Sequence, residues 1–298
     1  MTEKLRSIWQ HRLFRRFFYI AILFLLAVNV IMPIIYGVMA VTARRDSVGM
    51  PPEGFVPRTL TTSDGVALMA WYVPPENGAA IILVHGASGS RETMRPYAQM
   101  LVDAGYGVLA FDLRGQGESD GQKNLFGWAG TRDVGAAVAF LQEQPDVEMI
   151  GGLGLSLGGE VLLGALSTYP EIAAAVSEGA TQRSLEEFRA VTSRRNLLRS
   201  MPPGFMYFTV QLLSGDNPPL PLLDSIMQAA DTPLLLIAAG NVSAEIDYNT
   251  LFAETAGDRA ELWLVEDADH AAGYERDSVA YADRVIDFFN AHLLAADA

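Results

Sequence analysis

One stretch of the sequence, residues 17–43, carries no charged side chain over 27 positions. A helix needs about 20 apolar residues to cross a bilayer, whereas a cleavable signal peptide has an apolar region of roughly 7 to 15. Asn29 and Pro33 are tolerable there, because freed backbone groups in a membrane helix find local partners. We therefore expect an uncleaved transmembrane signal anchor that binds the membrane. The alternatives are a buried core helix and cleavage at Val41-Thr42-Ala43.

Basic residues flank this run unequally. Two basic residues, Arg44 and Arg45, follow it, and the preceding residues 1–16 contain Lys4, Arg6, Arg12, Arg15 and Arg16. Because positive charge favours the cytoplasmic side, we expect residues 1–16 to be a cytoplasmic N-terminus. The protein would then be a single-pass protein of the cell membrane, with its larger part outside the cytoplasm. Residues 44–57, rich in proline, predict a linker.

The charge balance excludes nucleic acid as a partner. The chain has 35 acidic and 21 basic residues, a formal net charge of −14, whereas a polyanion binder needs a basic surface. It has no cysteine, which rules out disulfides and thiolate chemistry. No G-x-G-x-x-G opens the first strand–helix unit and no cluster has metal-ligand spacing, so we expect no cofactor and no metal.

Residues 58–298 alternate short apolar runs with longer helical stretches, which is typical of a mostly parallel sheet with helices on both faces. The expected strands are 58–62 and 66–73, a hairpin, followed by 80–84, 107–111, 149–155, 173–177, 233–238 and 260–265. The expected helices are 92–104, 131–141, 157–168, 248–256 and 277–293. Residues 181–230 hold no convincing strand, and an insertion of that length predicts a helical lid over the carboxyl ends of the strands.

A serine lies among glycines directly after one expected strand, in Gly154-Leu155-Ser156-Leu157-Gly158. In a tight strand-to-helix turn, bulky side chains at positions 154 and 158 would collide with neighbouring backbone. Such a turn exposes the serine at a helix N-terminus, where developing negative charge is favoured. The sequence therefore predicts Ser156 as a nucleophile, with a purely structural glycine turn as the alternative.

A serine nucleophile needs a base, and the chain has four histidines. His270 follows an expected strand and comes after the serine in the chain, the order Ser, acid, His that this architecture uses. His11 precedes the apolar run, His85 ends an expected strand, and His292 lies near the end of the last helix. His270 is therefore the expected base, and His85 is expected to be structural.

The carboxylate that orients the base should come from the loop after residues 233–238. Glu245 is preferred, because it is expected in the loop proper, whereas Asp247 is placed to cap a helix beginning at Tyr248. Glu178, at the end of the preceding strand, is the third alternative.

Four segments resemble the α/β-hydrolase superfamily, nearest its dienelactone-hydrolase-like and serine-aminopeptidase-like branches. They are LVHGASGSR at 83–91, FDLRGQGESDG at 111–121, GLGLSLGGE at 152–160 and DADH at 267–270. The resemblance covers residues 58–294 and implies an eight-stranded α/β-hydrolase fold. It also implies Ser156 and His270 in a catalytic triad, with the backbone N–H groups of Ala87 and Leu157 as the oxyanion hole. The family's commoner aspartate would stand at Ser243, which leaves Glu245 as a shifted substitute.

Together these features predict a membrane-anchored, carboxylesterase-like serine hydrolase that acts on a small-molecule acyl substrate. The lid run Phe205-Met206-Tyr207-Phe208 is expected to bind an apolar acyl group, which favours a carboxylic ester over an amide or thioester. The alternatives are a peptidase or thioesterase of the same fold, and a catalytically inactive, membrane-anchored binding module.

Overall fold

The computed structural model describes residues 12–87, 89–191 and 197–294. Its centre is an eight-stranded sheet in the order β1-β2-β4-β3-β5-β6-β7-β8. β1 and β2 run antiparallel to their neighbours, and β3 to β8 are parallel. The strands are β1 Val56–Thr61, β2 Ala67–Val73, β3 Ala79–Val84, β4 Gly107–Phe111, β5 Met149–Leu155, β6 Ile172–Glu178, β7 Leu234–Ala239 and β8 Ala260–Val265.

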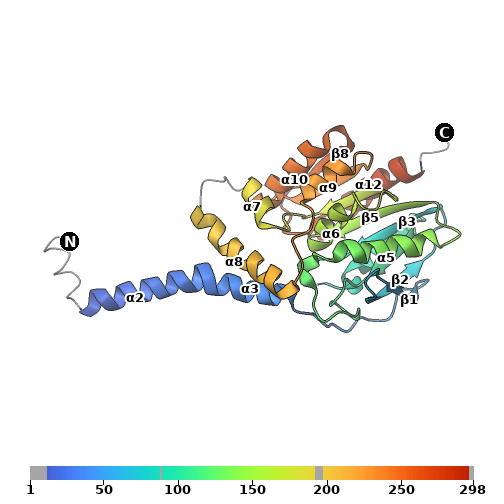
Figure 1. The fold of residues 1–298 in the computed structure, drawn as a ribbon. Helices are drawn as coiled ribbons and strands as arrows, with labels where there is room; N and C mark the ends of the chain where they lie inside the picture. Colours follow the sequence, from blue (N-terminus) through green and yellow to red (C-terminus); the bar gives the residue numbers. More distant parts are fainter. Residues whose placement is uncertain (1–11, 88, 192–196, 295–298) are drawn as a thin grey trace.

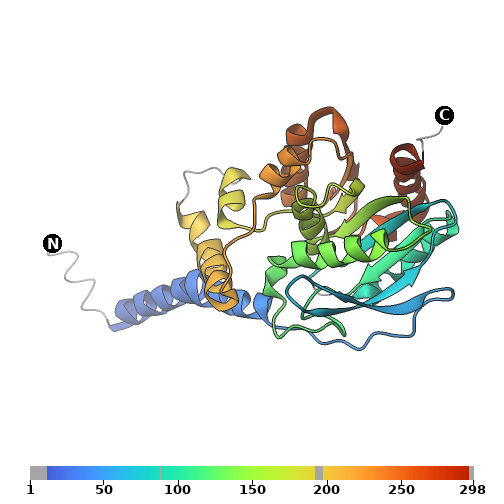
Figure 2. The same cartoon turned by 45° about the vertical axis from the view of Figure 1, so that its right-hand side comes forward.

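Helices cover both faces of this sheet (Figures 1 and 2). One face carries α5 Gly130–Gln142, α6 Leu157–Ala165, α9 Leu222–Gln228 and α10 Ser243–Ala256, and the other carries α4 Arg95–Asp103, α12 Ser278–Phe289 and the π-helical η5 Asn290–Leu294. Strand β3 shows why both faces are apolar: all its residues are buried, with Ile82 and Val84 in one core cluster and Ile81 and Leu83 in the other. The continuous apolar runs of the sequence are therefore strands covered on both sides.

The expected alternation of strands and helices is confirmed, and three strands, 107–111, 149–155 and 260–265, have the predicted bounds. Most other bounds differ by one to four residues, and the largest error is at the start of one helix. Helix α10 begins at Ser243 and not at Tyr248, so Glu245 and Asp247 both lie in its first turns. The preceding Val242 gives no side-chain cap, so the usual signal of a helix start is missing from the sequence.

The N-terminal apolar run forms one continuous helical rod that leaves the body of the protein (Figure 1). It consists of α2 Arg12–Leu26, the π-helical turn η1 Ala27–Ile31 and α3 Met32–Val41. Residues Phe14–Val41 are long and apolar enough to cross a membrane, although a signal sequence has the same features. The π turn lies directly before Pro33, where a proline in a regular helix would clash with the preceding turn.

The insertion between β6 and β7 contains α7 Leu185–Val191 and α8 Leu197–Ser214 before α9. Helix α8 lies alongside α3 in both views (Figures 1 and 2). The two backbones approach closely at Gly37, where a Cβ atom would lie 2.8 Å from the carbonyl oxygen of Met206. Tyr207 and Val210 of α8 are buried in one cluster with Val41 and Trp128. Much of the apolar surface of the insertion is thus used to pack it onto the N-terminal helix.

The segment after the rod is attached to the body of the protein. Thr42 pairs with Lys123 and Arg44 pairs with Gln116 in β-bridges. The guanidinium of Arg45 donates to the carbonyl oxygens of Ser119 and Gly121. The end of the helix is therefore fixed against the loop that follows β4.

Candidate active site

Ser156 occupies the sharp turn between β5 and α6. Its φ of 52° and ψ of −119° lie in a region that favours glycine. A Cβ atom at Gly154 would lie 2.4 Å from the carbonyl oxygen of Gly158, and one at Gly158 would lie 2.1 Å from that of Val84. The two glycines are thus required by the close approach of three backbone segments, and the turn raises the serine above the carboxyl end of β5.

Three side chains from separate segments form a continuous hydrogen-bonded chain at this edge of the sheet. The Oγ of Ser156 lies 2.7 Å from Nε2 of His270, in the loop after β8. The Nδ1 of His270 lies 2.5 Å from Oε1 of Glu245, in the first turn of α10. This is the order and geometry of a nucleophile, a base and an orienting acid.

Burial and hydrogen bonds fix the acid more firmly than the base. Glu245 is fully buried, and its second oxygen accepts the N–H of Ala239 at 2.9 Å. The side chain of His270 is 53% exposed. The hydrogen bond that His270 donates to Glu245 raises the pKa of His270, because the carboxylate stabilises the imidazolium, and partial burial opposes this effect. The same bond favours a neutral imidazole with its proton on Nδ1, which leaves Nε2 free to accept the serine proton.

The other two carboxylates considered from the sequence do not contact His270. The carboxylate of Glu178 is buried and accepts the N–H of Gly273 at 2.7 Å and the hydroxyl of Tyr281 at 2.8 Å, and burial raises its pKa. Asp247 lies exposed on α10. Helix α10 thus presents Glu245 to the site and Asp247 to solvent, which the helix boundary expected from the sequence did not reveal.

The two N–H groups expected to bind an oxyanion flank the serine. Leu157 is the next residue, and Ala87 lies in the loop after β3, where a Cβ on Gly86 would be 3.4 Å from that of Ser156. Within the described part of the chain, neither of these N–H groups donates to a protein acceptor. The arrangement leaves both free for a substrate oxygen.

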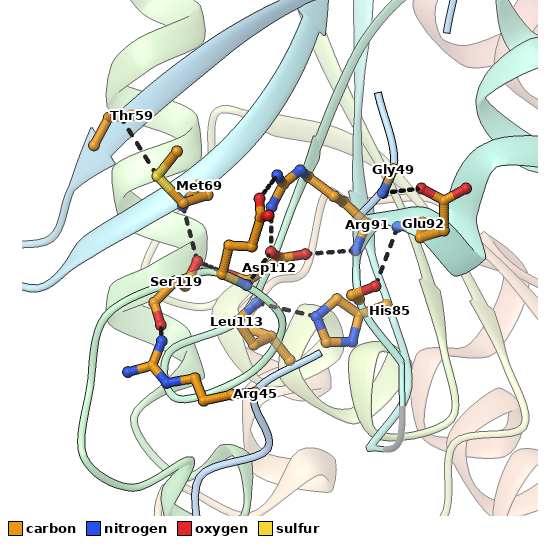
Figure 3. A network of polar contacts seen from close by, with 12 residues as sticks. Arg45, Gly49, Thr59, Met69, His85, Arg91, Glu92, Asp112, Leu113 and Ser119 are labelled. Atoms are coloured by element: carbon orange, nitrogen blue, oxygen red, sulfur yellow. Dashed lines mark hydrogen bonds and ion pairs between the residues drawn. The ribbon is translucent and has the colours of Figure 1, made fainter. Parts of the chain in front are cut away.

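His85 holds the loop after β3 in place through hydrogen bonds of its buried ring. It is completely buried, its Nδ1 lies 2.8 Å from the carbonyl oxygen of Gly86, and its Nε2 accepts the N–H of Leu113 at 3.1 Å. Burial lowers its pKa, so the ring is neutral. The bond to Leu113 joins the loop after β3 to the loop after β4 (Figure 3).

Asp112 joins the same two loops a second time (Figure 3). Its carboxylate is fully buried, accepts the backbone N–H of Arg91 at 2.6 Å and that of Glu118 at 2.8 Å, and pairs with the guanidinium of Arg91. Ser119 continues the network, because its hydroxyl donates to the carbonyl oxygen of Asp112. Since the carbonyl of Ser119 also accepts Arg45, the network extends to the end of the N-terminal helix.

We expect Asp112→Ala to lower the free energy of unfolding by about 3 kcal/mol, since removing one partner of a buried ion pair leaves its partner charge under-compensated. Thermal and urea unfolding of the detergent-solubilised chain would measure this. Asp120→Ala is the matched control, because Asp120 is exposed in the same loop. Equal unfolding midpoints for the two variants would contradict the structural role given to Asp112.

Two cavities lie near the insertion. The larger, about 580 Å³, is formed mainly by α7, α8 and residues 218–221 and contains none of the three side chains above. Tyr207 and Phe208 line it, whereas Phe205 and Met206 line neither cavity. The smaller, about 140 Å³, is lined by Tyr36, Met39, Ala40, Arg44, Ala87, Asn124, Phe126 and Leu157. Neither cavity is lined by Ser156 itself, and of the two only the smaller is lined by Ala87 and Leu157 beside it.

Known proteins share this fold. A model of the serine aminopeptidase S33 family matches residues 75–210. A solved esterase of Pyrococcus furiosus is 26% identical, with a TM-score of 0.68 over 84% of this chain and 99% of its own. A dienelactone hydrolase of Anabaena variabilis is 20% identical, with a TM-score of 0.60 over 80% and 98% of the two chains. The chain therefore has the α/β-hydrolase fold, and the proteins that it is similar to include an esterase and a dienelactone hydrolase.

Two relatives show how the similarity is distributed. The protein YfhR of Salmonella typhi is 27% identical over 80% of this chain and 82% of its own length. The thiohydrolase aneE of Aspergillus aculeatus is 36% identical, but only over 35% of each chain. The first similarity thus spans most of the protein, and the second spans about a third of it.

Proposed function

We propose that the protein hydrolyses a carboxylic ester through an acyl-enzyme intermediate on Ser156. The observation that carries the proposal is the hydrogen-bonded chain Ser156–His270–Glu245, with two backbone N–H groups beside the serine that donate to no acceptor among the described residues. A purely structural turn would not account for a histidine Nε2 at 2.7 Å from the serine Oγ, nor for a buried carboxylate bonded to the other nitrogen of that histidine.

Each group then has a defined task. The Oγ of Ser156 attacks the acyl carbon while Nε2 of His270 takes its proton, and the N–H groups of Ala87 and Leu157 hold the oxyanion. The bond to the alkoxide breaks, and His270 gives its proton to the departing alcohol. Water then attacks the acyl carbon with His270 again as base, which releases the carboxylic acid and restores the serine.

An ester is favoured over an amide or a thioester by two lines of support. The cavity beside the serine has a mainly apolar lining, and one similar solved structure is an esterase. Two other substrates compete with an ester. The match to the serine aminopeptidase S33 family supports an amide, and the partial similarity to a thiohydrolase supports a thioester. We further propose that Phe14–Val41 spans the cell membrane once, with the hydrolase body outside the cytoplasm, in agreement with the basic N-terminus.

Labelling with a fluorophosphonate probe tests the proposal, because such probes react with activated serines. We expect the full chain in detergent to be labelled at Ser156, as located by peptide mass spectrometry, and His270→Ala to lose the label. His292→Ala is the matched control, since His292 is exposed near the end of the chain. A well-folded chain without a label would instead favour the inactive binding module.

The acyl bond is then identified by comparing p-nitrophenyl esters, the corresponding thioesters and amino-acid p-nitroanilides under the same conditions. We expect the largest kcat/KM with the esters. Faster turnover of a thioester or an anilide would replace the esterase assignment with a thioesterase or a peptidase.

A further inference from the structure

The smaller cavity lies between the proposed oxyanion hole and the N-terminal helix. Ala87 and Leu157 form its wall on the side of the serine, whereas Tyr36, Met39 and Ala40 form its wall on the side of α3. Phe126, from the short η3 Leu125–Gly127, completes its apolar lining. Helix α3 therefore does more than anchor the protein. It forms part of the wall of the space into which a bound acyl group would extend.

The cavity adjoins the apolar flank of the helix. Tyr36 is 58% exposed and Met39 is 63% exposed, although both line the cavity. On the neighbouring α8, Phe208 and Leu212 are exposed as well. Exposed apolar side chains of α3 thus lie at the cavity itself, whose lining also includes Arg44 and Asn124.

The cavity lies near one end of the apolar span. Tyr36 lies five residues before Val41, the last residue of the span, which is about 7.5 Å along a helix axis. With Phe14–Val41 across a bilayer, Tyr36 would lie where tyrosines concentrate, at the boundary between hydrocarbon and headgroups. The ester bond of a membrane lipid lies at this same boundary.

The wall formed by the helix is firmly positioned. Gly37 packs against α8, and Thr42, Arg44 and Arg45 are held by the loop after β4. A flexible tether would bring a helix near the site only part of the time. The geometry here keeps it as a permanent part of the site.

We propose that the last two turns of the N-terminal helix form part of the acyl-binding pocket, and that the substrate is a long-chain fatty acyl ester that enters from the bilayer. This inference rests on the proposed ester hydrolysis and adds its substrate class. The helix thus determines specificity, and it does so through Tyr36, Met39 and Ala40.

The test measures kcat/KM of the full chain in nanodiscs for p-nitrophenyl acetate and p-nitrophenyl laurate. For Ala40→Trp, which fills the cavity, we expect the laurate-to-acetate ratio to fall at least tenfold. Val38→Trp is the matched control, because Val38 is exposed on the same helix and does not line the cavity. Its ratio should equal that of the unchanged chain. Ala40→Leu, a smaller change, should give an intermediate ratio and serves if Ala40→Trp fails to fold.

Fluorophosphonate labelling of the same samples separates the two proposals. If Ser156 is labelled and esters are hydrolysed, but Ala40→Trp or Ala40→Leu keeps the ratio of the unchanged chain, the pocket inference is wrong and the esterase proposal stands. A drop of equal size in Val38→Trp would also overturn the pocket inference. If the unchanged chain is neither labelled nor active on any ester, the esterase proposal itself fails.

Discussion

Ser156→Ala is expected to lower kcat for p-nitrophenyl ester hydrolysis at least a thousandfold, and up to about a millionfold. The expected loss is this large because, in the proposed mechanism, the variant removes the atom that forms the acyl-enzyme, the Oγ that lies 2.7 Å from Nε2 of His270. Residual hydrolysis would come from the oxyanion donors and binding alone. Steady-state kinetics with purified full chain in detergent would measure the effect.

Two further variants show that this loss is chemical. Ser63→Ala changes an exposed serine of the β1–β2 turn and should leave kcat unchanged. Ser156→Gly should be as inactive as Ser156→Ala but should unfold at a higher temperature, because φ of 52° suits glycine better than alanine. Activity of Ser156→Ala within tenfold of the unchanged chain would exclude Ser156 as the nucleophile.

Glu245→Gln is expected to lower kcat about a thousandfold to ten-thousandfold. The amide of glutamine can donate to Nδ1 of His270, which moves the ring proton to Nε2, where it blocks removal of the serine proton. Glu245 is fully buried, so its position is shielded from bulk solvent. The same kinetic assay would measure this loss.

The pH profile gives this variant a second, independent signature. The base is active when neutral, so kcat/KM falls as the pH drops through the pKa of His270. Glu245 raises this pKa above its usual value of about 6.5. Without the carboxylate the imidazolium loses its stabilisation, and the acidic limb of the profile should move to lower pH. An unmoved limb would mean that Glu245 does not contact the working base.

The two rejected carboxylates serve as controls. Asp247→Asn should change neither kcat nor the position of the acidic limb, because Asp247 is exposed on α10. Glu178→Gln should mainly lower the unfolding temperature, since Glu178 accepts hydrogen bonds from Gly273 and Tyr281. If Asp247→Asn alone abolished activity, the orienting acid would have been assigned to the wrong residue.

The sheet could be predicted well from the sequence, because strands buried on both faces are continuous apolar runs. The segment Ala79–Val84 is an example, and its neighbour Gly107–Phe111 was predicted to the residue. The serine turn could be predicted for a different reason. Gly154 and Gly158 prevent local collisions that depend only on the adjacent backbone and strand β3.

Other features depend on contacts between segments far apart in the chain. Three carboxylates follow suitable strands, and the sequence cannot show that the fold buries Glu245 against His270 while it exposes Asp247. The run Phe205-Met206-Tyr207-Phe208 suggests an apolar lining of the site. The packing of α8 against α3 determines which of these side chains are buried, and Tyr207 is buried in a cluster with Val41.

The attachment of residues 42–45 to the loop after β4 makes the helix and the body turn together. The apolar span of 28 residues is about 42 Å long as a helix, whereas the hydrocarbon core is about 30 Å thick. In the proposed membrane-spanning arrangement, such a helix tilts to fit, and it tilts further in a thinner bilayer. Because the body follows the tilt, the thickness of the surrounding lipid would set the height of Ser156 above the hydrocarbon, and with it the depth at which an ester bond can be cleaved.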